Sequence, residues 1–234
     1  MVDCALPPKI ATNMRVVMIT STTAQIAARD IFKLARIVPV VSVDDPDQGI
    51  ALARALVAGG LPVVEMTLRS PNALKVTEAI ARQVPEVMLG LGTILSVPQI
   101  TAAISAGARF LVSPGMTPIL AEAAAGCAVP FLPGIATISE AMRLRELGFR
   151  TLKFFPAESS GGIAALKGFH PVLPDLSFCP TGGITAASAA SYLALPNVAG
   201  LGGSWIAPAA LLKAGDYAAI EVLARQASAL AAAT

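Results

Sequence analysis

A lysine lies inside a short segment that otherwise has the composition of a buried strand, residues 151–157, TLKFFPA. Side chains alternate between the two faces of a strand, so Lys153 lies on the opposite face from Leu152 and Phe154. If those two apolar residues pack on helices, the lysine points into the protein interior. Burial disfavours the charged form of an amine, so such a lysine either pairs with a carboxylate or acts as a nucleophile toward a ketone.

A carboxylate occupies an equivalent position in a second apolar segment, residues 62–68, PVVEMTL. Alternation places Glu65 on the opposite face from Val64 and Met66, and therefore also toward the interior. A carboxyl group near a reactive lysine can transfer protons during catalysis. It can equally serve as the structural counterion of that lysine, and these two interpretations remain open at this point.

Two further polar residues follow predicted strands. Arg69 comes directly after the second segment, where a guanidinium can form a bidentate pair with a substrate carboxylate. An arginine at such a position is also commonly a solvated surface residue. Thr93 ends the segment VMLGLGT, where it is either a substrate contact or the cap of the next helix.

Two glycine-rich segments, PTGGIT at 180–185 and LGGSW at 201–205, follow late strand candidates. Glycines let backbone N–H groups approach an anion, and the start of a helix adds its dipole. Both segments therefore indicate a phosphate site, with tight turns that bind nothing as the alternative.

The single histidine excludes several other kinds of catalytic site. Metal-dependent aldolases and hydrolases generally need several imidazole ligands, and a Ser–His–Asp triad needs a well-placed histidine. His170 lies in a segment, GFHPVLP, that predicts a surface loop. We therefore expect no metal site.

The elements that must position these residues alternate regularly. Eight strand candidates are each followed by a helical pattern, after a first helix at 22–36; they span 37–43, 62–68, 87–93, 109–115, 129–135, 151–157, 176–183 and 198–204. This order predicts an α/β protein, a (β/α)8 TIM barrel with an extra N-terminal helix. A doubly wound open sheet is the rival, but no GxGxxG follows the first strand. In such barrels the active site lies at the carboxyl ends of the strands.

Composition limits the class of protein. The chain has 234 residues, 55% hydrophobic and 14% charged, with a net charge of +2, which argues against nucleic-acid binding. Apolar runs are interrupted before they reach membrane-spanning length. Three scattered cysteines, without a CxxC spacing, favour the reducing cytoplasm. Residues 1–21 make a poor signal peptide and are interpreted as an N-terminal extension, followed by one domain over 22–234.

The ordered motifs EMTLRSP, LGTIL, SPGMTP, PFLPGIATISE, LKFFPAESSGG, FCPTGGIT and LGGSW resemble those of the 2-keto-3-deoxy-6-phosphogluconate and 4-hydroxy-2-oxoglutarate aldolases. The resemblance covers about residues 30–225. It departs at Met66 and Ser70, where the family often has Val and Thr, and neither change affects the expected chemistry.

The resemblance implies a role for each candidate residue. Lys153 is expected to form a Schiff base and Glu65 to act as general acid and base. The pyruvyl group is expected to contact Arg69, Thr93 and Pro114, and the phosphate to lie on Gly182, Gly183, Gly203 and Ser204. It also implies a homotrimer that needs no cofactor.

The implied reaction is cleavage of 2-keto-3-deoxy-6-phosphogluconate to pyruvate and glyceraldehyde 3-phosphate, together with cleavage of 4-hydroxy-2-oxoglutarate to pyruvate and glyoxylate. The alternatives are an aldolase for the galactonate-series substrate, another phosphate-binding barrel such as an isomerase, and a barrel that binds small molecules without catalysis.

Overall fold

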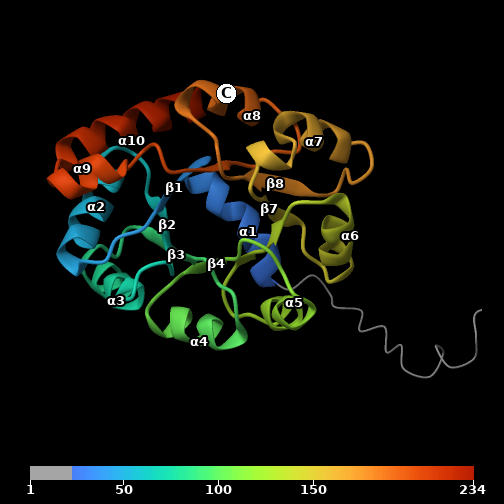
Figure 1. Ribbon diagram of the computed structural model, residues 1–234, viewed down its shortest axis with the longest axis horizontal. Helices are drawn as coiled ribbons and strands as arrows, with labels where there is room; N and C mark the ends of the chain where they lie inside the picture. The colour runs from blue at the N-terminus through green and yellow to red at the C-terminus, as the bar shows by residue number, and fades with distance from the viewer. Residues whose placement is uncertain (1–22) are drawn as a thin grey trace, which may run out of the picture.

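The computed structural model describes residues 23–234, in which parallel strands form a central ring surrounded by helices (Figure 1). The described strands are β1 (Ile37–Val41), β2 (Val63–Thr67), β3 (Met88–Gly92), β4 (Phe110–Val112), β5 (Phe131–Leu132), β6 (Gly134–Ile135), β7 (Thr151–Phe154), β8 (Ser177–Pro180) and β9 (Leu201–Gly203). All eight predicted strand positions contain a strand, which confirms the predicted barrel fold. The predicted N-terminal extension lies outside the described residues.

The strand order runs β5-β4-β3-β2-β1-β9 in one sheet and β6-β7-β8 in the other. Two isolated parallel bridges, Phe178 to Val198 and Thr181 to Gly202, connect β8 with the β9 region. At the other junction the predicted fifth strand is divided in two by Pro133. Proline has no N–H to donate, so the ladder is interrupted there: β5 pairs with β4, and β6 pairs with β7.

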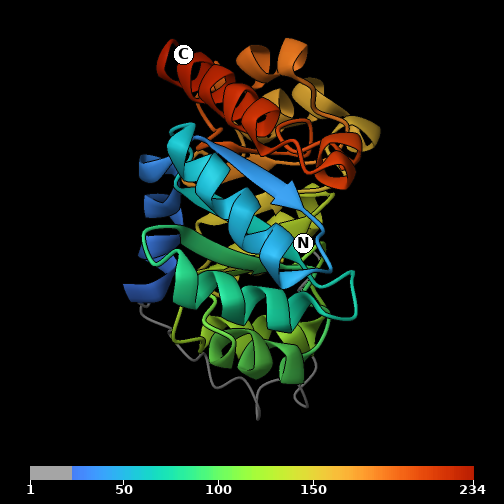
Figure 2. The same cartoon turned by 90° about the vertical axis from the view of Figure 1, so that its left-hand side faces the viewer.

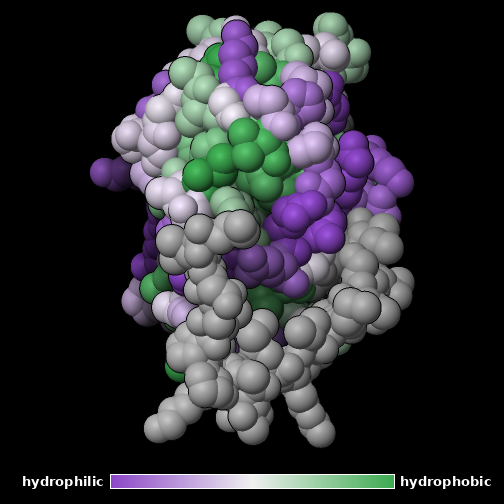
Figure 3. All heavy atoms as spheres, turned by 90° about the vertical axis from the view of Figure 1, so that its right-hand side faces the viewer, coloured by the Kyte–Doolittle hydropathy of each residue, from purple (hydrophilic) through white to green (hydrophobic). Residues whose placement is uncertain are grey.

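Helices cover the outside of the strand ring (Figures 1 and 2). The described helices are α1 (Thr23–Leu34), α2 (Pro46–Ala58), α3 (Ala73–Gln83), α4 (Val97–Ser105), α5 (Pro118–Ala125), α6 (Ile138–Glu146), the 3-10 turn η1 (Glu158–Ser160), α7 (Gly162–Phe169), α8 (Ala186–Leu193), α9 (Ala209–Ala214) and α10 (Tyr217–Ala232). None of these described helices is long and apolar enough to cross a membrane. On the side that carries α6 and α7, the surface shows an apolar patch among polar residues (Figure 3).

The first helix, α1, lies across the amino-terminal ends of the strands rather than on the outside of the ring (Figure 2). Its residues Ile31 and Phe32 are buried, 1% and 5% exposed. Gly200 lies so close that a Cβ there would overlap the Phe32 ring and lie 2.6 Å from the Arg36 carbonyl oxygen. The helix therefore closes one end of the barrel and leaves the carboxyl ends of the strands as the open end.

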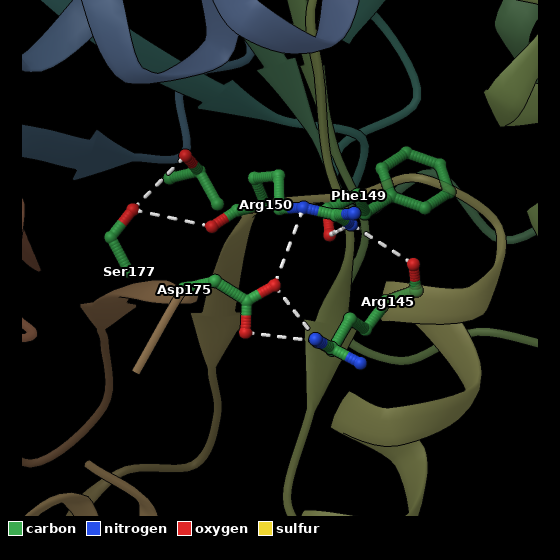
Figure 4. A network of polar contacts seen from close by, with 6 residues as sticks. Arg145, Phe149, Arg150, Asp175 and Ser177 are labelled. Atoms are coloured by element: carbon green, nitrogen blue, oxygen red, sulfur yellow. Dashed lines mark hydrogen bonds and ion pairs between the residues drawn. The ribbon is translucent and has the colours of Figure 1, made fainter. Parts of the chain in front are cut away.

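A polar network fixes the beginnings of β7 and β8 at the closed end (Figure 4). Arg145 Nε donates to both oxygens of Asp175 at 2.9 and 2.8 Å, and Arg150 Nη1 donates to the carbonyl oxygens of Arg145 and Phe149. Partial burial raises the pKa of Asp175, but hydrogen bonds and the two guanidinium charges lower it more, so it lies below its ordinary value. The carboxylate thus stays ionised and holds the two strands in register.

Candidate active site

Lys153 on β7 and Glu65 on β2 meet inside the barrel. The amine Nζ lies 3.0 Å from Oε1 and 3.3 Å from Oε2 of the carboxylate. Both residues are buried, 5% and 4% exposed. The structure therefore confirms that alternation points both side chains to the interior. A direct contact between an amine and a carboxyl group gives the lysine a partner to which its proton can be transferred.

Besides Glu65, the amine has an aromatic ring and a thiol as neighbours. The Phe155 ring centroid lies 5.5 Å from Lys153 Nζ, and Cys179 on β8 is the register partner of Lys153. Burial raises the pKa of Cys179 to about 12, although the charge of Lys153 acts in the opposite direction. The thiol therefore stays neutral at physiological pH, and Glu65 is the residue that makes an ion pair with Lys153.

Gly92, the last residue of β3, makes room for the Glu65 carboxylate. A Cβ at this position would overlap Oε1 and lie 2.7 Å from Cδ of Glu65. The next residue, Thr93, has a φ of +64°, the one positive φ among the described residues other than glycine. A left-handed threonine costs about 1–3 kcal/mol, which points to a functional constraint. The N-cap of α4 is Ser96, so the interpretation of Thr93 as that cap is wrong.

Pro114 lies next to the strand position that faces Lys153. Gly134 is the register partner of Lys153 on β6. A Cβ on Gly134 would overlap the Pro114 backbone and lie 2.6 Å from the nitrogen of Gly115. The chain after β4 therefore approaches the β6–β7 pair closely, on the same side of the barrel as the amine.

A cavity of about 140 Å³ opens at the carboxyl ends of the strands. The predicted residues Arg69, Gly182, Gly183 and Ser204 all line this mouth cavity, together with Val40, Ser42, Thr67, Phe155, Thr181, Ile184 and Gly202. Gly182 and Gly183 have φ values of +100° and +80°, which residues other than glycine rarely adopt. The structure thus brings Arg69 together with the two late glycine-rich segments, whereas Lys153, Glu65, Thr93 and Pro114 do not line this cavity.

Gly203 does not line the mouth cavity, although Ser204 does. A Cβ on Gly203 would overlap the Trp205 ring. The glycine at this position is therefore required by the packing of Trp205, whatever its backbone contributes to binding.

The 3-10 turn η1 contacts the loop that contains Gly182 and Gly183, called the glycine loop below. Glu158 N donates to the Gly182 carbonyl oxygen at 3.1 Å, and the Tyr192 hydroxyl donates to Glu158 Oε1 at 2.6 Å. Burial raises the pKa of Tyr192, and the neighbouring carboxylate raises it further. The tyrosine therefore remains a hydrogen-bond donor and holds Glu158 against the loop at 182–183.

Comparison with known proteins assigns the family. The model of the "Aldolase: KDPG and KHG aldolase" family matches residues 28–223. The chain belongs to this family. It is a carbon–carbon lyase, as its curated relatives are.

Two curated relatives are similar to the aldolase over most of its length. A 2-dehydro-3-deoxy-phosphogluconate aldolase of Pseudoalteromonas atlantica is 45% identical over 208 residues, which cover 89% of this chain and 97% of the relative. A KHG/KDPG aldolase of Escherichia coli K12 is 44% identical over 201 residues, which cover 86% and 94%.

Solved structures agree with the fold of the aldolase. A KDPG aldolase of Legionella pneumophila, with pyruvate captured as a covalent carbinolamine, has a TM-score of 0.84 and 39% identity, covering 86% of this chain and 98% of the other. A 2-keto-3-deoxy-6-phosphogluconate aldolase of Zymomonas mobilis, solved with 3-phosphoglycerate, has a TM-score of 0.83 and 42% identity, covering 88% and 97%.

Several residues of the site were missed by sequence reasoning. Alternation places Cys179 and Thr181 on one face of the β8 segment, so that signal was available. The role of Gly92 depends on the distance between β2 and β3 side chains, and no local pattern reveals it. The hydroxyl oxygens of Ser42 and Thr67 lie 2.5 Å apart. Alternation shows which face of its strand each residue is on, but their contact follows only from the register of β1 with β2.

His170 lies in a turn, as its segment predicts, but its side chain is only partly exposed. This residue directly follows α7 and is half-buried, and its Nδ1 is buried without a hydrogen-bond partner in the described part of the chain. It lines a separate cavity of about 360 Å³ with Arg150 and Asp175, at the closed end of the barrel. Within residues 23–234 no group of three or more metal-ligating side chains was found.

Substitution of Gly92 tests whether the position of Glu65 matters for the reaction. Gly92→Ala should displace the Glu65 carboxylate and lower the rate of aldol cleavage by about 10²-fold or more, the usual effect of losing an acid–base group. The rate is measured by coupling pyruvate release to its enzymatic reduction. Gly168→Ala is the matched control, because a Cβ there meets nothing within 4 Å. A Gly92→Ala enzyme that folds and retains full activity would contradict this requirement.

The pKa of Cys179 predicts a pH dependence of stability. In the unfolded chain the thiol ionises near its ordinary value of 9.0, whereas the folded protein keeps it protonated to about 12. Above pH 9 the unfolded state thus binds fewer protons, and this thiol lowers the free energy of unfolding as pH rises toward 12. In Cys179→Ala the free energy of unfolding should therefore fall less steeply with pH, by about 1 kcal/mol per pH unit. Urea unfolding at about pH 8 and about pH 10.5 measures it. Equal pH slopes in the two proteins would disprove the burial effect.

Proposed function

We propose that this protein is a class I aldolase that cleaves 2-keto-3-deoxy-6-phosphogluconate through a Schiff base on Lys153. The observation that carries the proposal is the buried contact between Lys153 and Glu65, 3.0 Å apart, inside the barrel. The names of the curated relatives support the substrate. The covalent pyruvate adduct of the Legionella relative supports a covalent mechanism.

The reaction begins when Lys153 transfers a proton to Glu65 and its neutral amine attacks the C2 ketone of the substrate. Glu65 then protonates the hydroxyl of the carbinolamine, which leaves as water and gives an iminium. Removal of the C4 hydroxyl proton by Glu65 breaks the C3–C4 bond, and the electron pair moves into the iminium. The aldehyde departs, leaving an enamine that Glu65 protonates at carbon. Hydrolysis then releases pyruvate and regenerates the amine. The iminium is the electron sink, so the proposed steps need no cofactor.

The mouth cavity supplies four of the proposed binding groups, Arg69, Gly182, Gly183 and Ser204. Arg69 is proposed to bind the carboxylate of the substrate, with Thr93 and Pro114 beside the pyruvyl carbons. The backbone of Gly182, Gly183 and Gly203, with the hydroxyl of Ser204, is proposed to bind the phosphate. The loop ends at Thr185, the N-cap of α8, so the helix dipole also favours an anion there. The 3-phosphoglycerate in the Zymomonas relative supports a phosphorylated ligand.

4-Hydroxy-2-oxoglutarate is a proposed second substrate, supported by the name of the Escherichia coli relative. The galactonate-series substrate is the alternative. A native KDPGal structure shares 28% identity with this chain, against 42% for the Zymomonas protein. Pyruvate release from the two C4 epimers of the phosphorylated substrate distinguishes these proposals.

We also propose that the aldolase is a homotrimer in the cytoplasm. The trimer comes from the family resemblance, and exposed apolar side chains on neighbouring helices support a self-association surface. Leu95, Val97 and Ile119 lie at or just before the starts of α4 and α5, and Met142 lies in the middle of α6. The two cysteines in the described residues are free, as is usual for a reducing compartment.

Trapping with borohydride tests the Schiff base. Incubation with pyruvate and sodium borohydride should attach a reduced pyruvyl group to Lys153, detected by mass spectrometry and peptide mapping. Lys153→Met should not be modified and should lose about 10³-fold or more in cleavage rate. Recovery of unmodified wild-type protein would contradict the covalent mechanism.

Glu65→Gln is the matched variant, since it keeps the shape of the side chain and removes the proton carrier. It should still be trapped at high pyruvate concentration, while its cleavage rate falls by about 10²–10⁴-fold. Near-normal cleavage in this variant would make Glu65 a structural counterion.

Sedimentation velocity tests the trimer. The wild-type protein should sediment as three copies of 23.8 kDa. Ile119→Asp places a charge on a side chain that is 74% exposed and should shift the protein toward the monomer. Val222→Asp on α10, 47% exposed, is the control and should leave the trimer intact. A monomeric wild-type protein at micromolar concentration would contradict the proposal.

A further inference from the structure

Ser42 lies at the mouth of the barrel and belongs to no role assigned above. It directly follows β1, is exposed, and lines the mouth cavity with Arg69 and Ser204. Val40, two residues earlier on the same face of β1, lines this cavity as well. The hydroxyl of Ser42 is therefore within the space that a substrate would occupy.

The hydrogen bonds of Thr67 determine what Ser42 can offer to a ligand. Thr67 is 1% exposed, and its hydroxyl donates to the Val41 carbonyl oxygen at 3.1 Å. Either hydroxyl can donate in the 2.5 Å contact between the two side chains. Because Thr67 has one hydrogen and also contacts the Val41 carbonyl oxygen, which can only accept, we assign Ser42 as the donor and Thr67 as the acceptor. The hydrogen of Ser42 is thus directed at β2, and its free lone pair remains for the cavity.

A hydroxyl that can only accept does not suit a phosphate or a carboxylate, which are themselves acceptors. The donors in the same cavity include the Arg69 guanidinium, the Ser204 hydroxyl and the backbone N–H groups of Gly182 and Gly183. Ser42 instead complements a hydroxyl group of the substrate. The mouth cavity therefore contains separate positions for anionic groups and for a neutral donor.

We propose that Ser42 is a specificity-determining residue that accepts a hydrogen bond from the C5 hydroxyl of the substrate. This inference rests on the proposed function. The C4 hydroxyl loses its proton to Glu65 in that mechanism, which leaves the C5 hydroxyl as the donor between the reacting carbons and the phosphate. 4-Hydroxy-2-oxoglutarate has no C5 hydroxyl, so Ser42 favours the phosphorylated sugar acid over it.

The reverse condensation of pyruvate with two aldehydes tests the proposal. The C2 hydroxyl of D-glyceraldehyde 3-phosphate becomes the C5 hydroxyl of the product, and 3-oxopropyl phosphate lacks it. The ratio of kcat/KM for the first aldehyde to that for the second should fall by about 3–10-fold in Ser42→Ala, the usual effect of one neutral hydrogen bond. Ser42→Thr keeps a hydroxyl and should restore most of the ratio. Ser105→Ala, which removes an exposed hydroxyl at the end of α4, should leave the ratio unchanged.

Trapping of each variant with pyruvate and borohydride first verifies that its active site is folded. An unchanged ratio in trappable Ser42→Ala would disprove the role of Ser42 and leave the proposed function intact. A wild-type protein that condenses pyruvate with neither aldehyde would contradict the proposed function, and the role of Ser42 with it.

Discussion

The contact between Lys153 and Glu65 is the constraint on which the rest of the site depends. Two charged groups buried in a barrel cost several kcal/mol of desolvation each, and their mutual attraction offsets this only with close geometry. Such a pair is therefore weak evidence for stability. Its position beside a neutral thiol and beside Phe155, a residue that lines the mouth cavity, favours a chemical role.

Small residues around the pair show how the fold accommodates it. Gly92 leaves the volume that the Glu65 carboxylate occupies, and Gly134 lets the chain at Pro114 approach the strand that carries Lys153. Pro133, just before Gly134, interrupts the ladder and separates β5 from β6. Gly92 and Gly134 lie on strands next to β2 and β7, and Pro133 directly precedes β6. Each therefore affects the space around the pair without contributing a reactive group.

The sequence predicted the parts of the site that follow from local periodicity. Alternation within two segments was sufficient to point Lys153 and Glu65 inward, and strand–helix alternation was sufficient for the barrel. The division of the fifth strand at Pro133 was not predicted. The effect of a single proline on strand pairing can be predicted only when both neighbouring strands are known. The turn at His170 was predicted, but its partial burial was not, because that depends on residues distant in the sequence. The roles of Gly92 and Ser42 arise between strands, where distances depend on register rather than on either segment alone.

The two ends of the barrel differ in what covers them. At the closed end, α1 contributes the buried side chains of Ile31 and Phe32. Thr151, which lies two residues before Lys153 on the same face of β7, is 3% exposed. The mouth cavity, lined by Arg69, Gly182, Gly183 and Ser42, lies at the opposite end, and the proposed function has the substrate enter there. In the proposed binding mode, a ligand that places its anions on the donors and a hydroxyl on Ser42 has one orientation available. That orientation is what allows a buried amine, fixed by its carboxylate, to meet one particular carbon of the chain.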